Sequence, residues 1–413
     1  MKFKTRFLAL LLAASPAFAA DFALKEGDRV VFYGDSITDQ RLYTTFVEAF
    51  VTTRFPGKNI TFVHSGWGGD RVTGGGGGPV DKRLKRDVIA YKPTVITIML
   101  GMNDASYQPF KTEIFDTYAK GYEHIVDTIK SELPNTRLTL IQPSPFDDVT
   151  RAPNFEGGYN QVLLKYGEFV KDLAGKKGAQ VADLNTTLTE ATKKAEKVNH
   201  DQAVQFNPDR VHPAPAGQLL MAEGLLKAWN APDVVSRVEI DANAGTFTGT
   251  NAVVKEFAKG NSIAWTQQDE ALPFPLDLDD KVTGLALASS DFLDALDRQI
   301  LKVSNLTASE YTLKIDGQDV GTYTKEQLAG GVNLAGLKTP MWQHSRQVLD
   351  LIRTHNDAHN VRWRVLSEAT YGQYEAAYQE AHQAIGRLEA EVVKKIRETA
   401  QPKPHRFELS PKA

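Results

Sequence analysis

Between residues 28 and 230, short runs of β-branched and other apolar residues alternate with longer segments of helical periodicity. This alternation is typical of βαβ units, in which helices join parallel strands. We therefore expect a three-layer α/β domain, with its ligand site at the carboxyl ends of the strands. The expected strands are 29–33, 60–63, 94–100, 137–141 and 180–183. The expected helices are 40–54, 81–90, 111–133, 159–174, 186–198 and 216–229.

The character of the sequence changes after Pro232, where short polar segments of β character are separated by Gly, Asn and Asp. We expect a first domain over 21–233, a small β-rich module over 234–338 and a C-terminal helical segment over 339–413. In that last segment, apolar residues recur at spacings of three and four, at Tyr374, Tyr378, Ala381, Ile385, Leu388, Val392 and Ile396. This apolar stripe packs either on the chain's own α/β domain or on a second subunit, as a homodimeric coiled coil.

The first twenty residues resemble a signal peptide, with a basic start, an apolar run over 7–14 and small residues around Ala17 and Ala19. We expect this segment to be removed on export, which makes the protein periplasmic or secreted. The alternative is an N-terminal anchor helix, but the apolar run is shorter than the roughly 20 residues that a membrane span needs. No later stretch is long and apolar enough, so no integral membrane span is expected.

Charge and cysteine content exclude several classes of function. The net charge is -3, and it becomes -6 without residues 1–20, because Lys2, Lys4 and Arg6 contribute three positive charges. No basic stripe is present, so we expect no nucleic-acid partner. The chain has no Cys, which excludes disulfides, thiolate zinc sites and a cysteine nucleophile.

Four segments carry residues suited to chemistry, and the first runs from Val30 to Thr38. It is an apolar strand followed by the small-residue turn Gly-Asp-Ser and by helical sequence. Such a turn would place Ser36 at the carboxyl edge of the sheet, where its backbone N–H and the following helix N-terminus favour an oxyanion. The alternative is a Ser or Thr that only caps the helix.

The second and third segments, 64–70 and 101–104, also follow expected strands. In the second, Gly66 could donate its N–H to a ligand, and Trp67 either stacks on a sugar or acyl group or packs within the loop. In the third, Asn103 offers a side-chain amide. Taken singly, both segments are also ordinary turn sequences.

The fourth segment is 207–213, just before the last expected helix of the domain. Asp209 and His212 are three residues apart, so one turn lets the carboxylate accept from Nδ1–H of the ring and leaves Nε2 to accept a proton. A loop ion pair, or a metal site formed with His64, are the alternatives.

Together the four segments resemble the conserved blocks of the SGNH, or GDSL-type, hydrolase superfamily of serine esterases, over about residues 28–230. Gly34-Asp35-Ser36-Ile37 is similar to the first block, and Gly66 to the glycine of the second, although His64 stands where Asn is usual. Gly101-Met102-Asn103-Asp104 fits the third block, and Asp209 with His212 fits the last. The resemblance implies a flavodoxin-like sheet and a shallow, open site.

The resemblance also implies a mechanism. Ser36 is the expected nucleophile, His212 its base and Asp209 the carboxylate behind the base, and an acyl-enzyme is the intermediate. The N–H groups of Ser36 and Gly66 and the Asn103 amide form the expected oxyanion hole. Asp35 and Asp104 are expected to orient their turns. No cofactor or metal is expected, and activity should fall as the pH drops through the free histidine range near 6.5.

The expected substrate is an acylated small molecule or glycan, and the favoured activity is carbohydrate O-acetylesterase. The alternatives are a lysophospholipase, arylesterase or thioesterase acting on longer acyl groups, or a glycan-binding protein without turnover. Trp342, Arg362, Trp363 and Arg364 either cap the cleft, bind a glycan or pack at a domain joint.

Overall fold

The computed structural model describes residues 21–366 and 375–412. The signal peptide expected over 1–20 lies outside the described residues. Residues 21–233 build a parallel five-stranded sheet in the order β2-β1-β5-β6-β7. Its strands are β1 (Arg29–Gly34), β2 (Thr61–Gly66), β5 (Val95–Met99), β6 (Arg137–Ile141) and β7 (Gln180–Ala182). The first four strands are almost wholly buried, which explains their continuous apolar runs.

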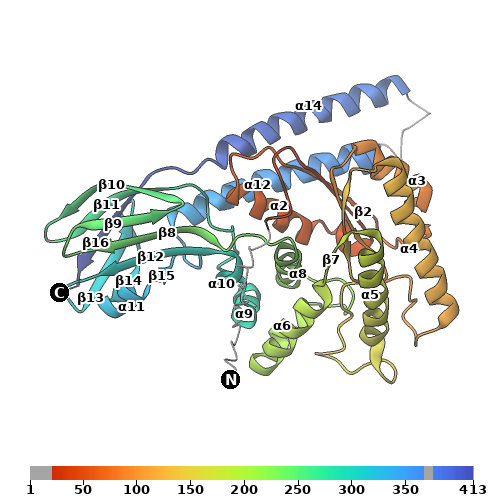
Figure 1. Cartoon of the computed structure of the whole chain (residues 1–413), viewed down its shortest axis with the longest axis horizontal. Coiled ribbons are helices and arrows are strands. Elements are labelled where there is room, and N and C mark those ends of the chain that lie inside the picture. Colours follow the sequence, from red (N-terminus) through yellow and green to blue (C-terminus); the bar gives the residue numbers. More distant parts are fainter. Residues whose placement is uncertain (1–20, 367–374, 413) are drawn as a thin grey trace, which may run out of the picture.

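Helices cover both faces of this sheet, as expected for a three-layer α/β domain (Figure 1). Helices α2 and α8, with α6 beside α8, lie on one side, and α3, α4 and α5 lie on the other. The bounds are α1 (Ser36–Asp39), α2 (Leu42–Arg54), α3 (Val80–Asp87), η1 (Ile89–Tyr91), α4 (Thr112–Glu132), α5 (Gly158–Lys177), α6 (Leu184–Val198), α7 (His200–Val204) and α8 (Pro215–Ala228). The strand order confirms the flavodoxin-like, three-layer fold class.

The run of glycines over 74–78 forms a short hairpin of β3 (Gly74–Gly75) and β4 (Gly78–Pro79). A Cβ atom on Gly77 would lie 2.4 Å from Cδ of Arg83, and one on Gly76 would lie 3.1 Å from Nε1 of Trp67. The glycines therefore let this hairpin pack closely over buried side chains.

The strands that follow residue 233, beginning with β8 at Val234, form a β-rich module of two sheets. One sheet has the order β15-β12-β8-β9 and the other β10-β11-β16-β13-β14. The bounds are β8 (Val234–Asp241), β9 (Thr246–Thr250), β10 (Ala252–Lys259), β11 (Ile263–Asp269), β12 (Arg298–Ser304), β13 (Glu310–Ile315), β14 (Gln318–Thr324) and β15 (Val332–Asn333). Burial alternates along β8, β11, β12 and β13, so each sheet presents one apolar face to a shared core. Trp265 and Phe407 stack in that core, with ring centroids 5.2 Å apart.

The module also contains helices α9 (Lys281–Ser289), α10 (Phe292–Leu296) and α11 (Lys325–Gly330). Helices α9 and α10 pack on α8 of the first domain. Buried Arg54 of α2 donates to the carbonyl oxygen of Leu296 (2.8 Å) and lies 3.3 Å from Asp297. The two parts of the chain thus share one continuous apolar core.

The C-terminal segment corrects one expectation, because it is not helical throughout. Helix α12 (Pro340–Asn360) continues into a π-helical turn, η2 (Val361–Leu366), and α14 (Glu375–Thr399) follows after the undescribed residues. Residues His405–Pro411 then form β16, which pairs between β11 and β13. The last strand of the chain therefore lies in the middle of a module sheet, where Phe407 and Leu409 are buried.

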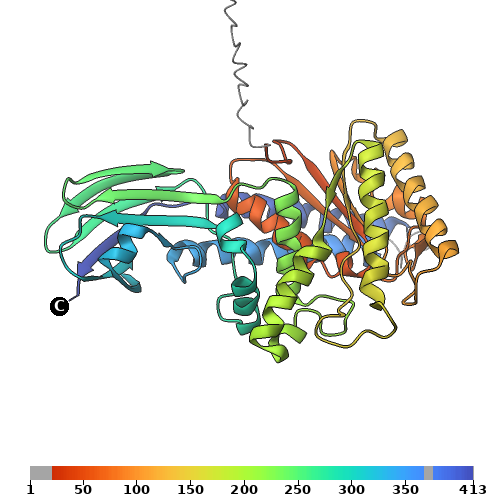
Figure 2. The ribbon, with the colours of Figure 1, turned by 60° about the horizontal axis from the view of Figure 1, so that its bottom comes forward.

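Helices α12 and α14 run from the module along the first domain, as Figures 1 and 2 show. The apolar stripe of α14 packs on α12: Tyr378 and Ile396 are buried, whereas Leu388 is 48% exposed. Tyr374, the first residue of the expected stripe, lies outside the described residues. The homodimer stays a prediction. Within the described ranges, no helix combines the length and the apolar character needed to cross a bilayer.

Candidate active site

Ser36 lies at the carboxyl end of β1, as the first residue of α1. Asp35 caps this helix by accepting a hydrogen bond from the N–H of Ile37 at 3.0 Å. The turn needs Gly34, because a Cβ atom there would lie 2.3 Å from Oγ1 of Thr38 and 2.8 Å from the carbonyl oxygen of Met99. The strand-to-helix turn therefore presents the Ser36 hydroxyl at the edge of the sheet.

His212 and Asp209 lie in the loop between α7 and α8, and they meet Ser36. Nε2 of His212 is 2.8 Å from Oγ of Ser36, and Nδ1 is 2.7 Å from Oδ2 of Asp209. Because a carboxylate only accepts, Nδ1 carries a proton and Nε2 accepts from the serine hydroxyl. The structure thus brings together the three residues that the sequence singled out, across 176 positions of the chain.

The loop itself holds Asp209 in place. Its Oδ1 accepts from the N–H groups of His212 (2.7 Å) and Val211 (2.9 Å). Burial opposes ionisation of Asp209, but these hydrogen bonds and the His212 ring outweigh it and hold the pKa of the carboxyl below its usual range. The side chains of His212 and Asp209 remain 37% and 56% exposed, so this part of the site is open to solvent.

Gly66 and Asn103 lie at the carboxyl ends of β2 and β5, the two strands beside β1. Gly66 is the last residue of β2 and pairs with Gly34, and a Cβ atom on it would lie 2.1 Å from the backbone nitrogen of Asp39. Only glycine lets β2 approach α1 this closely. Asn103 follows β5; its amide donates one hydrogen bond to the carbonyl oxygen of Asp70 (3.0 Å), and its Oδ1 accepts from the Tyr107 hydroxyl (3.1 Å).

Asp35 and Asp104 orient backbone groups, as expected. Oδ1 of Asp104 accepts from the N–H of Val72 at 2.9 Å, much as Asp35 caps α1. Burial raises the pKa of both carboxyls to about 7, against the opposing effect of these backbone hydrogen bonds.

Of the two alternatives for Trp67, the structure favours packing within the protein. The residue is only 9% exposed, and its ring meets Trp363 edge to face at a centroid distance of 5.7 Å. Guanidinium groups of Arg83, Arg86 and Arg364 lie 5.3, 5.1 and 4.3 Å from its ring centroid. The ring of Trp67 is therefore surrounded by cationic side chains and packs within the protein.

The turn η2 fastens the C-terminal helices to this site. Arg364 forms an ion pair with Oδ1 of Asp39, and Oδ2 of Asp39 accepts from the N–H of Gly68 at 3.1 Å. Trp363, 4% exposed, donates from Nε1 to Asp87 at 2.7 Å. Trp363 and Arg364 thus pack at a joint, and they contact the segments that contain Ser36 and Gly66.

Sequence reasoning gave no role to Asp39 or Tyr107, although both support the site. Asp39 lies three residues after Ser36 and could have been noticed as an acidic residue in the first helical turn. Nothing in the sequence pairs Tyr107 with Asn103.

His64 does not reach the site. It lies on β2 with 1% exposure, where Nδ1 is 2.7 Å from Oγ1 of Thr44 and Nε2 is 3.0 Å from Glu48. Burial lowers the pKa of His64 to about 3. His64 therefore does not join Asp209 and His212 in a metal site, and no cluster of three or more His, Asp or Glu residues suited to a metal occurs in 21–366 and 375–412.

Comparisons with known proteins agree with this fold and geometry. Residues 32–220 match the GDSL-like Lipase/Acylhydrolase family. An acetylxylan esterase of Geobacillus stearothermophilus is 26% identical over 219 residues, which are 49% of this chain and 93% of that protein. The structure of BT4096, a gut microbial diltiazem-metabolizing enzyme, has 25% identity and a TM-score of 0.78, and the match covers 94% of this chain and 98% of the other.

The family match spans all four segments, from the strand before Ser36 to the helix after His212. The likeness to BT4096 extends across the module and the C-terminal helices as well. The chain therefore belongs to the SGNH, or GDSL-type, hydrolase superfamily and is a carboxylic ester hydrolase.

Proposed function

We propose that the protein is a serine O-acetylesterase that acts on acetylated carbohydrate through an acyl-enzyme. The observation that carries the catalytic part is the chain of two hydrogen bonds from Ser36 through His212 to Asp209, at 2.8 and 2.7 Å. Such a chain can activate a hydroxyl as a nucleophile and stabilise the imidazolium that forms.

In the proposed reaction, Oγ of Ser36 attacks the ester carbonyl carbon while Nε2 of His212 takes the hydroxyl proton. Asp209 stabilises the resulting imidazolium. The carbonyl oxygen becomes negative, and it is held by the N–H groups of Ser36 and Gly66 and by the Asn103 amide. His212 then returns the proton to the leaving alcohol, and water cleaves the acyl-enzyme by the same route.

Two observations support a short acyl group on a bulky alcohol. The His212–Asp209 pair is open to solvent, so a large alcohol can approach it. Among the relatives, one is named an acetylxylan esterase, and the full-length relative BT4096 metabolises diltiazem, a compound that carries an acetate ester. We also propose that residues 1–20 direct export, which would bring such an enzyme to polymeric glycans. N-terminal sequencing of the mature protein tests whether this segment is removed.

The acyl preference is tested by comparing kcat/KM for p-nitrophenyl acetate and p-nitrophenyl octanoate, with Ser36→Ala as the background control. We expect the acetate to be hydrolysed at least about tenfold more efficiently, because a site that is open to solvent at His212 and Asp209 gains little from a longer chain. Preference for the octanoate would favour the longer-chain esterase alternative.

The alcohol is tested by measuring acetate release from acetylated xylan, acetylated pectin and diltiazem. Release from either polymer by the wild type, and its absence with Ser36→Ala, would support the carbohydrate assignment. Hydrolysis of p-nitrophenyl acetate and diltiazem with no release from any acetylated glycan would contradict it.

A further inference from the structure

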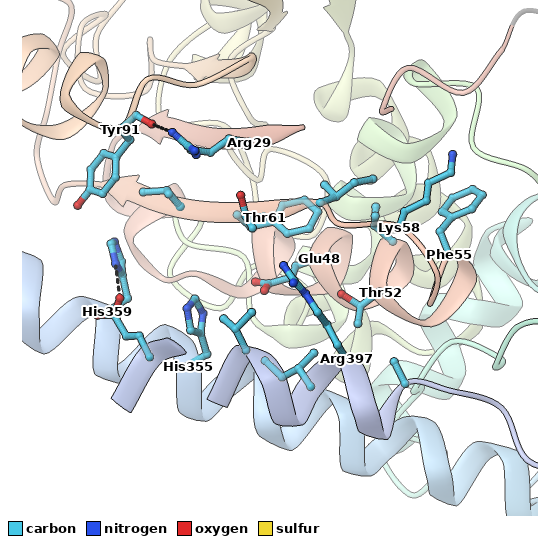
Figure 3. A pocket seen from close by; sticks show the side chains of 18 of the residues that line it. Arg29, Glu48, Thr52, Phe55, Lys58, Thr61, Tyr91, His355, His359 and Arg397 are labelled. Atoms are coloured by element: carbon cyan, nitrogen blue, oxygen red, sulfur yellow. Dashed lines mark hydrogen bonds and ion pairs between the residues drawn. The ribbon is translucent and has the colours of Figure 1, made fainter. Parts of the chain in front are cut away.

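A cavity lies away from Ser36, at the outer edge of the parallel sheet (Figure 3). Its volume is about 370 Å³, within the range of small-molecule sites. It is bounded by edge strand β2, helix α2 and the C-terminal helices α12 and α14. None of its lining residues belongs to the proposed catalytic machinery.

Part of the cavity wall is apolar. Val51 from α2, Phe62 and Val63 from β2, and Ile396 from α14 are buried, and Val393 of α14 lines the cavity beside them. The cavity exists because α14 packs on α12 and leaves a space towards β2. These walls suit an aromatic or aliphatic body.

The carboxylates that line the cavity are already satisfied. Glu389 forms two hydrogen bonds with Arg362, at 2.7 and 2.9 Å. Glu48 accepts from Asn356 at 3.1 Å and faces His64, and burial raises its pKa to about 7. Neither carboxylate is therefore available to neutralise a further cation.

Three cations that line the cavity remain, and all three are solvent-exposed. Nη1 of Arg29 donates to the carbonyl oxygen of Tyr91 at 2.6 Å, Arg397 donates to the side chain of Asn59, and Nζ of Lys58 lies over the Phe55 ring at 4.5 Å. These contacts are to a carbonyl oxygen, an amide and an aromatic ring, none of which carries a charge. The exposed rim is therefore positive and suits an anion.

His359 supplies a hydrogen-bond donor inside the cavity. Its side chain lines the wall at 5% exposure, and Nη2 of Arg362 lies 3.3 Å from its Nδ1. Oε2 of Glu389 lies 3.9 Å from the same nitrogen, which is too far for a hydrogen bond. Because a guanidinium only donates, Nδ1 accepts from Arg362, and the neutral ring carries its proton on Nε2. Nε2 is buried without a partner in the described structure. A buried donor of this kind is costly unless a ligand supplies an acceptor.

We propose that this cavity binds a small organic carboxylate with an apolar body and a hydrogen-bond acceptor at its far end. The carboxylate pairs with Arg397, Lys58 or Arg29 at the rim, and the body lies between α2 and α14. The acceptor at the inner end takes the hydrogen bond from Nε2–H of His359. The site is separate from ester hydrolysis, so it stands whether or not the acetylesterase assignment holds.

The test is isothermal titration of the full mature chain with 3-(4-methoxyphenyl)propionate. We expect saturable binding at one site. The corresponding amide, which lacks the charge, should bind at least about tenfold more weakly, because the positive rim no longer contributes. The 4-ethyl analogue, which lacks the acceptor oxygen, should bind about fivefold more weakly, as for one lost hydrogen bond.

Variants locate the site. Val393→Trp fills the cavity and should abolish binding, whereas Val198→Trp, at a 74% exposed position on α6, should leave it unchanged. Arg397→Gln should weaken binding roughly fivefold. Lys394→Gln makes the same charge change on α14, at a side chain that is 80% exposed, and should have no effect.

The inference is overturned if no saturable binding occurs, if the amide binds as well as the acid, or if folded Val393→Trp binds normally. If Val393→Trp fails to fold, the His359→Phe variant provides the test. In that variant, the methoxy and ethyl compounds should bind equally well, because the donor that distinguishes them is gone. A preference that persists there would also overturn the inference.

Discussion

We propose that Asn103 stabilises negative charge on a substrate oxygen. One N–H of its amide is held by the carbonyl oxygen of Asp70, which leaves the second N–H for a ligand. We expect Asn103→Ala to lower kcat about 100-fold to 1000-fold, as for loss of one oxyanion donor. Tyr107→Phe removes only the 3.1 Å hydrogen bond that orients the amide, and it should cost less. Steady-state kinetics with p-nitrophenyl acetate measure both, and full turnover by Asn103→Ala would remove Asn103 from the mechanism.

At the residue level, the sequence predicted the residues that converge but not their surroundings. Ser36, Asp209 and His212 were identifiable because each lies in a short motif whose spacing restricts local geometry. The sequence left two roles open for Trp67, because its environment comes from Arg83, Arg86 and Arg364, which lie 16 to 297 positions away. No local sequence pattern predicts that three guanidinium groups will contact the Trp67 ring.

Among the elements, η2 contacts the segment that positions the loop after Gly66. Arg364 holds Asp39, and Asp39 holds the N–H of Gly68. We expect Arg364→Gln to lower kcat about tenfold with little change in KM, because small displacements of catalytic groups are costly. Arg364→Lys should recover part of the loss.

The matched control for this prediction is Arg353→Gln on α12, which removes an exposed ion pair with Asp350. It should leave kcat unchanged. Equal turnover by Arg364→Gln and the wild type would show that η2 contributes only to packing.

Glu389 couples the docking of α14 to pH. Burial opposes its ionisation, but the hydrogen bonds from Arg362 and the charge of that guanidinium outweigh burial, and the pKa of Glu389 falls to about 2. A carboxyl whose pKa falls on folding stabilises the fold above its unfolded pKa near 4.5, and this contribution is lost as the pH falls towards 2. We expect Glu389→Gln to reduce the unfolding free energy by about 1–3 kcal/mol at pH 7. Urea unfolding at several pH values should show this difference shrinking below pH 4.5; a constant difference would contradict it.

The elements of the first domain were predictable, whereas the last strand was not. Strands β1, β5 and β6 are buried on both faces, so they appear in the sequence as continuous apolar runs. The partners of strand β16 are distant, because the residues of β11 and β13 with which it pairs lie more than 90 positions earlier in the chain. Phe407 and Leu409 alternate with polar residues, but this pattern identifies a strand only once its partner strands are known.

At the scale of the whole molecule, the buried pair of Arg54 and Asp297 joins the module to the hydrolase domain. Both side chains are at most 3% exposed, and Asp297 also accepts from the N–H of Phe274 at 3.0 Å. We expect Asp297→Ala to reduce the unfolding free energy by about 3–5 kcal/mol at pH 8, because it leaves the Arg54 charge buried and unpaired.

The exposed pair of Arg298 and Asp233 at the same junction provides a control. Asp233→Ala should cost about 0–1 kcal/mol. Denaturant unfolding measures both variants, and equal costs would show that the buried pair does not hold the two parts together.

The association of hydrolase domain, module and C-terminal helices was beyond sequence reasoning, because it depends on contacts between distant segments such as α8 with α9 and α2 with α12. The match to BT4096 over 94% of the chain indicates that this arrangement is shared. The catalytic proposal nevertheless depends only on the contacts among Ser36, His212 and Asp209.

Covalent labelling by a fluorophosphonate, followed by intact-mass and peptide analysis, tests these contacts most directly. We predict that one adduct forms per chain, that it maps to Ser36, and that His212→Ala abolishes it because no base remains to take the hydroxyl proton. Labelling at another residue, or rapid esterase turnover by Ser36→Ala protein, would contradict the account.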